Sequence, residues 1–133
     1  RLRGWNEAGR TIVSVAASLP FTAIVSDDRE DMASLYYYAR PRALPLRMWP
    51  REHAGNEYEA AYALRPEEAS NVLLITRKSD VSDLTRAFAS SERIATLETR
   101  LDSKRTRVFF LYALKNPIES TLFPKFFNRP STE

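Results

Sequence analysis

Apolar residues recur at steps of three and four positions over the first twenty residues, which predicts an amphipathic helix ended by Pro20. The positions that form this apolar stripe are Trp5, Ala8, Ile12, Val15, Ala16 and Leu19. Residues 21–26 follow as a short apolar run with β-branched members and predict a buried strand. The chain therefore begins with a helix that leads directly into a sheet.

The next helix has a clear start and stop in the sequence. Asp27 stands where an N-cap is expected, and Glu30 follows three residues later in capping-box spacing. One helical face then carries four apolar or aromatic residues: Met32, Leu35, Tyr36 and Ala39. Pro41 ends the helix, because proline disfavours the helical conformation of the residue before it.

Two more segments predict strands in the middle of the chain. Residues 44–49 alternate weakly and predict an edge strand, since Pro45 cannot donate a backbone hydrogen bond. Residues 71–76 (NVLLIT) form the clearest buried strand. Between them, residues 50–66 form a long polar connection.

The last third of the chain predicts a helix and a hairpin. Residues 81–88 predict a short helix, with Leu84 and Phe88 spaced to pack on the sheet. Residues 93–101 and 107–114 predict two antiparallel strands joined by a polar turn.

This order of elements predicts one α/β domain over residues 1–115, followed by an extended tail over residues 116–133. We expect a three-layer arrangement with a mostly parallel central sheet and an antiparallel C-terminal hairpin. The tail has three prolines and no periodicity. Its phenylalanines are able to pack onto the domain: Phe123, Phe126 and Phe127.

Composition narrows the possible functions. The 133 residues suit one domain, and three glycines are too few for a glycine-rich dinucleotide motif or a Walker loop. The absence of cysteine excludes disulfides, thiolate metal sites and cysteine nucleophiles. A single histidine, His53, excludes any site that needs two.

Charge and hydropathy bear on partners. Twenty Lys and Arg against 17 Asp and Glu are mixed along the chain, and the short basic groups, such as residues 40–42, are interpreted as solvated surface. We therefore expect no nucleic-acid partner. Residues 11–26 contain Pro20 and fall short of the roughly 20 apolar residues of a membrane helix. Because the chain lacks an initiator methionine, we expect it to be a piece of a longer protein.

Polar groups follow the predicted parallel strands. Ligands bind beyond the carboxyl ends of such strands, which places residues 27–30, 49–53 and 77–80 at one edge. Four cations there are able to bind a phosphate: Arg29, Arg51, Arg77 and Lys78. Ordinary solvated loops are the simpler interpretation. The carboxylates of residues 27–30 are likewise explained more simply by helix capping than by acid–base chemistry.

Aromatic residues offer a second kind of candidate. In the predicted helix Tyr36 belongs to the core, whereas Tyr37 or Tyr38 is free to face a partner or stack on a sugar. Residues 56–59 place amide, carboxylate and aromatic groups in a loop, where binding residues are common. An ordinary hydrogen-bonded turn explains the loop equally well.

Several of these segments, in this order, also carry a family resemblance. They read IVSDDREDMASLYYYAR (24–40), NEYEAAYAL (56–64), NVLLITR (71–77), RAFASSERIATLE (86–98) and VFFLYALK (108–115). Together they resemble the C-terminal soluble part of bacterial membrane enzymes of glycosyltransferase family 39, which are related to protein mannosyltransferases and to the lipid A aminoarabinose transferase. The resemblance covers about residues 10–115.

The resemblance implies a polytopic inner-membrane enzyme that transfers a sugar from a polyprenyl-phosphate donor, with this domain on the periplasmic side. In that family the catalytic acids lie in loops of the transmembrane part, so we expect no catalytic residue, metal or cofactor in this fragment. The implied partners are the transmembrane part of the same polypeptide and a lipid-linked sugar or acceptor. The expected ligand-binding face is Asp28, Arg29, Glu30, Tyr37, Asn56, Tyr58 and Glu59.

Two other functions remain open from the residues alone. One is a free-standing α/β module that binds a small anionic ligand at the strand ends. The other is a protein-interaction domain whose aromatic tail docks on a partner.

Overall fold

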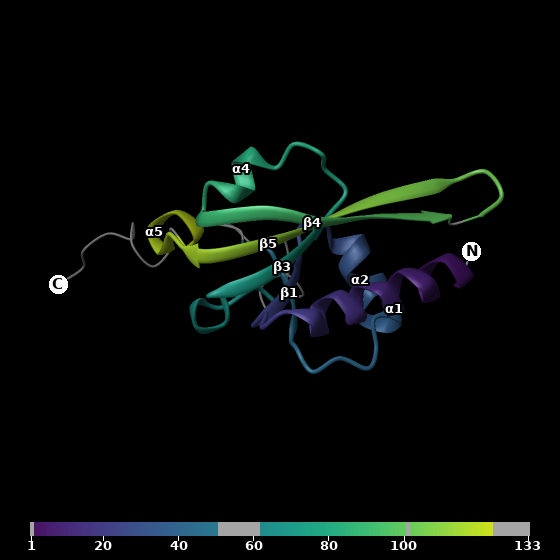
Figure 1. The fold of residues 1–133 in the computed structure, drawn as a ribbon, viewed down its shortest axis with the longest axis horizontal. Helices are drawn as coiled ribbons and strands as arrows, with labels where there is room; N and C mark the ends of the chain where they lie inside the picture. Colours follow the sequence, from purple (N-terminus) through teal and green to yellow (C-terminus); the bar gives the residue numbers. More distant parts are fainter. Residues whose placement is uncertain (1, 51–61, 101, 124–133) are drawn as a thin grey trace.

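Five strands form one mixed sheet in the order β2-β1-β3-β5-β4, with helices packed against it (Figure 1). The computed structural model describes residues 2–50, 62–100 and 102–123. The strands are β1 (Ala23–Ser26), β2 (Leu46–Met48), β3 (Asn71–Thr76), β4 (Phe88–Arg100) and β5 (Thr106–Pro117). The prediction of a single α/β domain with a C-terminal hairpin is confirmed, and the sheet is parallel on one side and antiparallel on the other.

The parallel side consists of β2, β1 and β3. Ile24 at the centre of β1 is in register with Leu46 of β2 and Leu73 of β3. All four residues of β1 are buried, as expected for a strand with neighbours on both sides. The sequence located each of these strands, and β2 lies at the edge of the sheet, as Pro45 predicted.

The antiparallel side consists of β5, paired with β3, and β4, paired with β5. The predicted hairpin is confirmed, but β4 begins at Phe88 rather than at residue 93. The helix predicted over 81–88 is correspondingly short, α4 (Ser82–Thr85). The sequence did not predict the start of β4 because its residues are polar. In this edge strand the polar side chains are exposed to solvent, while the backbone still pairs with β5, as Ser90 does with Lys115.

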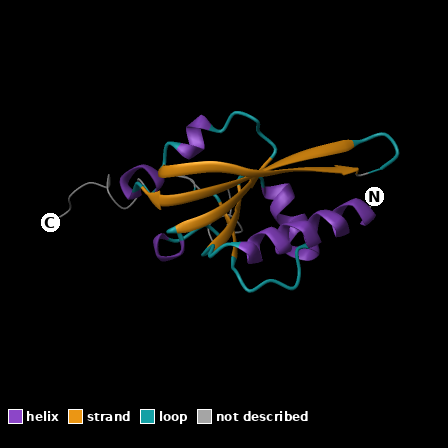
Figure 2. Cartoon of the chain, in the orientation of Figure 1, coloured by secondary structure: helices purple, strands orange, loops and turns teal. Residues whose placement is uncertain are grey.

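Two helices, α1 (Leu2–Ser18) and α2 (Arg29–Tyr38), pack on one face of the sheet (Figure 2). Five of the six residues in the predicted stripe of α1 pack in this core, and Ile12 is fully buried. The sixth, Leu19, was wrongly included: it lies beyond the last residue of α1 and is 46% exposed. Gly9 lets the two helices approach closely, since a Cβ at this position would collide with the backbone carbonyl of Tyr38. The positions of α1 and α2 on the sheet are therefore set by backbone contact as well as by apolar side chains.

The other face is covered by shorter elements, α4 and α5 (Glu119–Leu122). Leu64 and Ala69, which flank the short η1 (Pro66–Glu68), also pack there. Residues 116–123, expected as part of an extended tail, complete β5 and form α5, and Leu122 and Phe123 are buried. Phe126 and Phe127 lie outside the described residues. The C-terminal segment thus contributes to the core at least as far as Phe123.

Candidate functional site

The carboxyl ends of β1 and β3 do lie together, as the sequence predicted. Asp27 and Asp28 follow β1, and Arg77 and Lys78 follow β3, which is the parallel neighbour of β1. Of the residues expected beyond β2, Trp49 and Pro50 are described, and the Trp49 ring centroid lies 6.1 Å from that of Phe88. Arg51 and the single histidine, His53, lie outside the described part of the chain.

Asp28, not Asp27, caps α2. The Asp28 side chain accepts a hydrogen bond from the backbone N of Asp31 at 2.9 Å, and its own backbone is extended. Asp27 faces the neighbouring strand instead, where its Oδ2 accepts from Thr76 Oγ1 at 3.0 Å. The predicted N-cap is therefore wrong by one residue, because the bond to Thr76 holds Asp27 at the end of the sheet.

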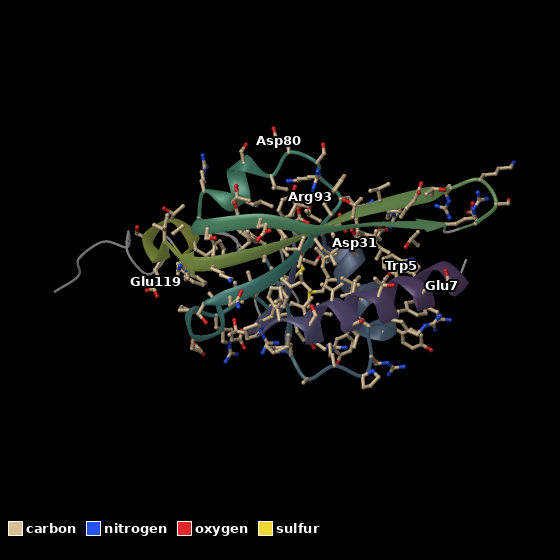
Figure 3. All side chains as sticks on the ribbon, viewed as in Figure 1. Trp5, Glu7, Asp31, Asp80, Arg93 and Glu119 are labelled. Carbon is tan, nitrogen blue, oxygen red and sulfur yellow. The ribbon has the colours of Figure 1, made fainter. Side chains whose placement is uncertain are left out.

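Asp31, which was not predicted from the sequence as a site residue, lies at the centre of a cluster of charged side chains at these strand ends (Figure 3). The cluster consists of Asp27, Asp28, Asp31, Arg77, Lys78 and Arg107. The Asp31 side chain is 2% exposed, and its two carboxylate oxygens accept from Arg77 Nε at 2.8 Å and from Arg107 Nη1 at 3.3 Å. Arg77 also reaches Asp28, with Nη2 at 2.7 Å from Oδ2. The available signal was its spacing, since Asp31 lies four residues before the buried Leu35 on one helical face.

Burial and the nearby Asp28 raise the pKa of Asp31 to about 6, although Arg77 and Arg107 oppose this shift. The pKa of Asp28 is lowered: its partial burial acts to raise it but is outweighed by the Asp31 amide and by Arg77. Burial raises the pKa of Asp27.

The charged groups of the cluster pair with one another. The carboxylates of Asp27, Asp28 and Asp31 face three cations, Arg77, Lys78 and Arg107. An incoming phosphate would have to displace a buried carboxylate to reach these cations. Among the described residues no group of three His, Cys, Asp or Glu side chains is placed to hold a metal. The cluster therefore fastens α2 to the sheet and is a poor anion site.

The expected ligand-binding residues do not all come together. Arg29 and Glu30 are exposed on the first turn of α2, whereas Tyr37 is 59% exposed near its last turn. Asn56, Tyr58 and Glu59 lie outside the described residues. The two described parts of the predicted face are thus at opposite ends of one helix.

The assignment of Tyr36 to the core is wrong. Tyr36 is 53% exposed, while Tyr38 packs against the core with its ring centroid 6.2 Å from that of Trp5. The face of α2 that is buried against the sheet includes Asp31, Met32 and Leu35. With Asp31 on this face, Tyr36 lies on the side of the helix that is exposed to solvent.

Tyr36 instead lines an open groove beside β2, with a volume of about 950 Å³. The groove runs along the loop from the end of α2 into β2, and its aromatic and cationic lining residues are Tyr36, Arg40, Arg42, Arg47 and Tyr62. Proline and leucine side chains of the same loop supply its apolar surface. The Tyr36 and Tyr62 rings meet edge to face, with centroids 6.4 Å apart.

The groove holds arginines in fixed positions. Arg42 Nη1 donates to the backbone carbonyl of Ala39 at 3.0 Å and to that of Tyr36 at 3.3 Å, and its guanidinium lies 5.0 Å from the Tyr36 ring centroid. Arg40 lies over the Tyr37 ring at 4.8 Å. Burial lowers the pKa of Arg42, and the neighbouring Arg40 lowers it further.

Arg40 and Arg42 form no ion pair with a carboxylate in the part of the chain that the structure describes. Arg47 differs, because it is held by Glu68 through a pair of hydrogen bonds of 2.9 Å. The basic group 40–42, interpreted from sequence as solvated surface, thus forms a wall of the groove. The signal that could have found it is the alternation of arginine with proline over residues 40–42, one residue after three consecutive tyrosines.

Comparison of the chain with protein-family models, curated proteins and solved structures found no match. Within the described residues, no helix has both the length and the apolar character needed to cross a membrane.

Proposed function

We propose that this chain is the extracytoplasmic, non-catalytic domain of a polytopic membrane glycosyltransferase. The parent enzyme transfers a sugar from a polyprenyl-phosphate donor, and the domain lies on the periplasmic side of the bacterial inner membrane. Its role is to help position the donor or the acceptor. The sequence resemblance over about residues 10–115 supports this assignment.

The observation that carries the positioning role is the groove beside β2. A lipid-linked sugar presents a phosphate next to a sugar ring, and the groove offers matching groups to both. Guanidinium groups bind phosphate through paired, charge-assisted hydrogen bonds, and Arg40 and Arg42 are not engaged by carboxylates of the described residues. The rings of Tyr36 and Tyr62 supply aromatic surface with a hydroxyl group, which suits a ligand that is partly polar.

The state of the buried carboxylate supports a non-catalytic role. Among the described residues, Asp31 has the most strongly raised carboxyl pKa, yet its side chain is 2% exposed and each of its oxygens accepts from an arginine. A general acid must come within hydrogen-bond distance of its substrate, so this enclosure argues against Asp31 as such an acid.

We also propose a three-layer arrangement for the domain. It is supported by α1 and α2 on one face of the sheet and by α4 and α5 on the other.

The test is sugar transfer in membranes that contain the whole protein. Arg40→Gln and Tyr36→Ala should each lower transfer about ten-fold, the equivalent of one lost charge-assisted or aromatic contact. Arg86→Gln is the matched control, because Arg86 is an exposed arginine next to α4 on the other face. Normal transfer by both groove variants, with normal protein levels, would overturn the positioning role.

A further inference from the structure

The hairpin of β4 and β5 continues past the rest of the sheet as a two-stranded ribbon. β3 pairs with β5 only as far as Thr76 and Phe110, whereas β4 stays paired with β5 through Arg100 and Thr106. In Figure 1 this ribbon projects at the end of the molecule where α1 begins, and α5 lies at the opposite end. The ribbon tip and the start of α1 therefore face the same side.

The ribbon is held against α1 both near its base and close to its tip. Phe109 is fully buried, with its ring centroid 5.5 Å from that of Trp5 in α1. Gly4 lies against the backbone carbonyl of Arg100 so closely that a Cβ would collide with it. These contacts fix the direction of the ribbon relative to the first turns of α1.

The tip carries a hydrogen-bonded Asp102 and three cations. Asp102 Oδ1 accepts from the backbone N of Lys104 and of Arg105, both at 2.8 Å, and its Oδ2 accepts from Arg105 Nε at 2.8 Å. Arg100 and Lys104 are exposed and have no carboxylate partner among the residues described. The tip thus presents two positive charges that no carboxylate of the described residues pairs.

We propose that this tip, formed by Arg100, Lys104 and Arg105, docks on anionic phospholipid headgroups. The inference rests on the proposed function: the resemblance is to a C-terminal soluble part, so the transmembrane part joins the domain at the start of α1. The tip beside that point then meets the surface of the same membrane. Anionic lipid attracts each nearby cation with a strength equivalent to about five-fold in a partition constant. Two such charges are enough to orient a domain that is already tethered to the membrane, but they do not bind a free domain to it.

The experiment uses the full 133-residue chain anchored through an N-terminal histidine tag to nickel-chelating lipid in vesicles. Because the chain has no cysteine, Ser103→Cys places one fluorophore at the tip, and Ser70→Cys places one next to the opposite end of the sheet. Energy transfer to a lipid-bound acceptor then reports which end approaches the surface. Phosphatidylcholine vesicles are compared with vesicles that also contain phosphatidylglycerol.

We expect phosphatidylglycerol to increase energy transfer from Ser103→Cys and not from Ser70→Cys, and high salt to abolish the increase. Arg100→Gln with Lys104→Gln should lower the ratio of docked to undocked domain about 25-fold. Arg86→Gln with Lys115→Gln removes the same charge from exposed sites away from the tip and should leave docking intact. Equal energy transfer on both vesicles, or a tip that binds an RNA homopolymer and ignores anionic lipid, would overturn docking.

This result is separable from the proposed function. Whether the native protein is a large membrane-bound species does not depend on the two tip residues. A membrane-bound parent with an unresponsive tip would reject docking alone.

Discussion

Arg107 of β5 donates a hydrogen bond to Asp31 of α2, with Nη1 3.3 Å from Oδ1, although 76 positions separate the two residues in sequence. Arg77 of the β3 end donates to the other oxygen of the same carboxylate at 2.8 Å. One buried acid thus joins a helix, a parallel strand and the hairpin. Arg77, one of the four cations that the sequence indicated as a candidate phosphate site, is therefore engaged in this structural role.

Asp31→Asn should alter the pH dependence of unfolding. Folding raises the pKa of Asp31 from 3.8 to about 6, so the folded chain takes up this proton more readily than the unfolded chain. Asp31 therefore contributes stability that is present at low pH and is lost as the pH rises through about 6. When the pH is lowered from 7 to 4, the free energy of unfolding of the wild type should rise by about 2 kcal/mol relative to that of Asp31→Asn. Urea unfolding at several pH values measures this difference, and a constant difference would contradict the burial of an ionisable Asp31.

Arg77→Gln should lower the free energy of unfolding by about 1 to 2 kcal/mol at pH 7, because it leaves Asp31 with one cation in place of two. The estimate is reduced from that for a fully buried pair, since the Arg77 side chain is 34% exposed. Lys78→Gln is the matched control: its Nζ lies 3.9 Å from Asp27 and its side chain is 57% exposed, so its effect should stay below about 0.5 kcal/mol. Equal effects of the two variants would argue against a central role for Asp31.

Gly9→Ala should destabilise the protein by about 1 to 3 kcal/mol, because a Cβ at this position collides with the Tyr38 carbonyl and forces α1 from α2. Helix propensity alone predicts the opposite sign, a gain of about 1 kcal/mol. Ser14→Ala, at an exposed position of the same helix, should be neutral or slightly stabilising. Thermal unfolding of both variants distinguishes the steric clash from helix propensity: the clash lowers the melting temperature of Gly9→Ala, whereas helix propensity alone would raise it.

Phe123→Ala should cost about 3 kcal/mol of stability, since this side chain is 4% exposed and belongs to the core under the sheet. Thr121→Ala, exposed on α5, provides the comparison and should change little. If Phe123→Ala unfolds at the same urea concentration as the wild type, residues 118–123 are not part of the folded unit.

The regular elements were predictable where local pattern and tertiary environment agree. Residues 71–76 form β3 as expected because their continuous apolar run suits a strand buried on both faces. The first helix was predictable for the same reason, since its apolar stripe matches the surface it covers.

The sequence predicted the buried face of α2 wrongly because residues far away in sequence determine which of its side chains are buried. Tyr36 and Asp31 compete for the inward face of α2, and apolar periodicity favours Tyr36. Asp31 is buried because Arg77 and Arg107 are present to pair with it, and no helical pattern contains that information. The groove follows from the same rotation, because it exposes Tyr36 beside Arg42.

The most direct test of the central claim is fractionation of cells that make the protein, probed with an antibody against this domain. Membership of a polytopic glycosyltransferase predicts a band several times heavier than the 15.3 kDa of this chain, released from membranes only by detergent. A soluble band near 15.3 kDa would contradict the claim and favour a free-standing module that binds a small anionic ligand.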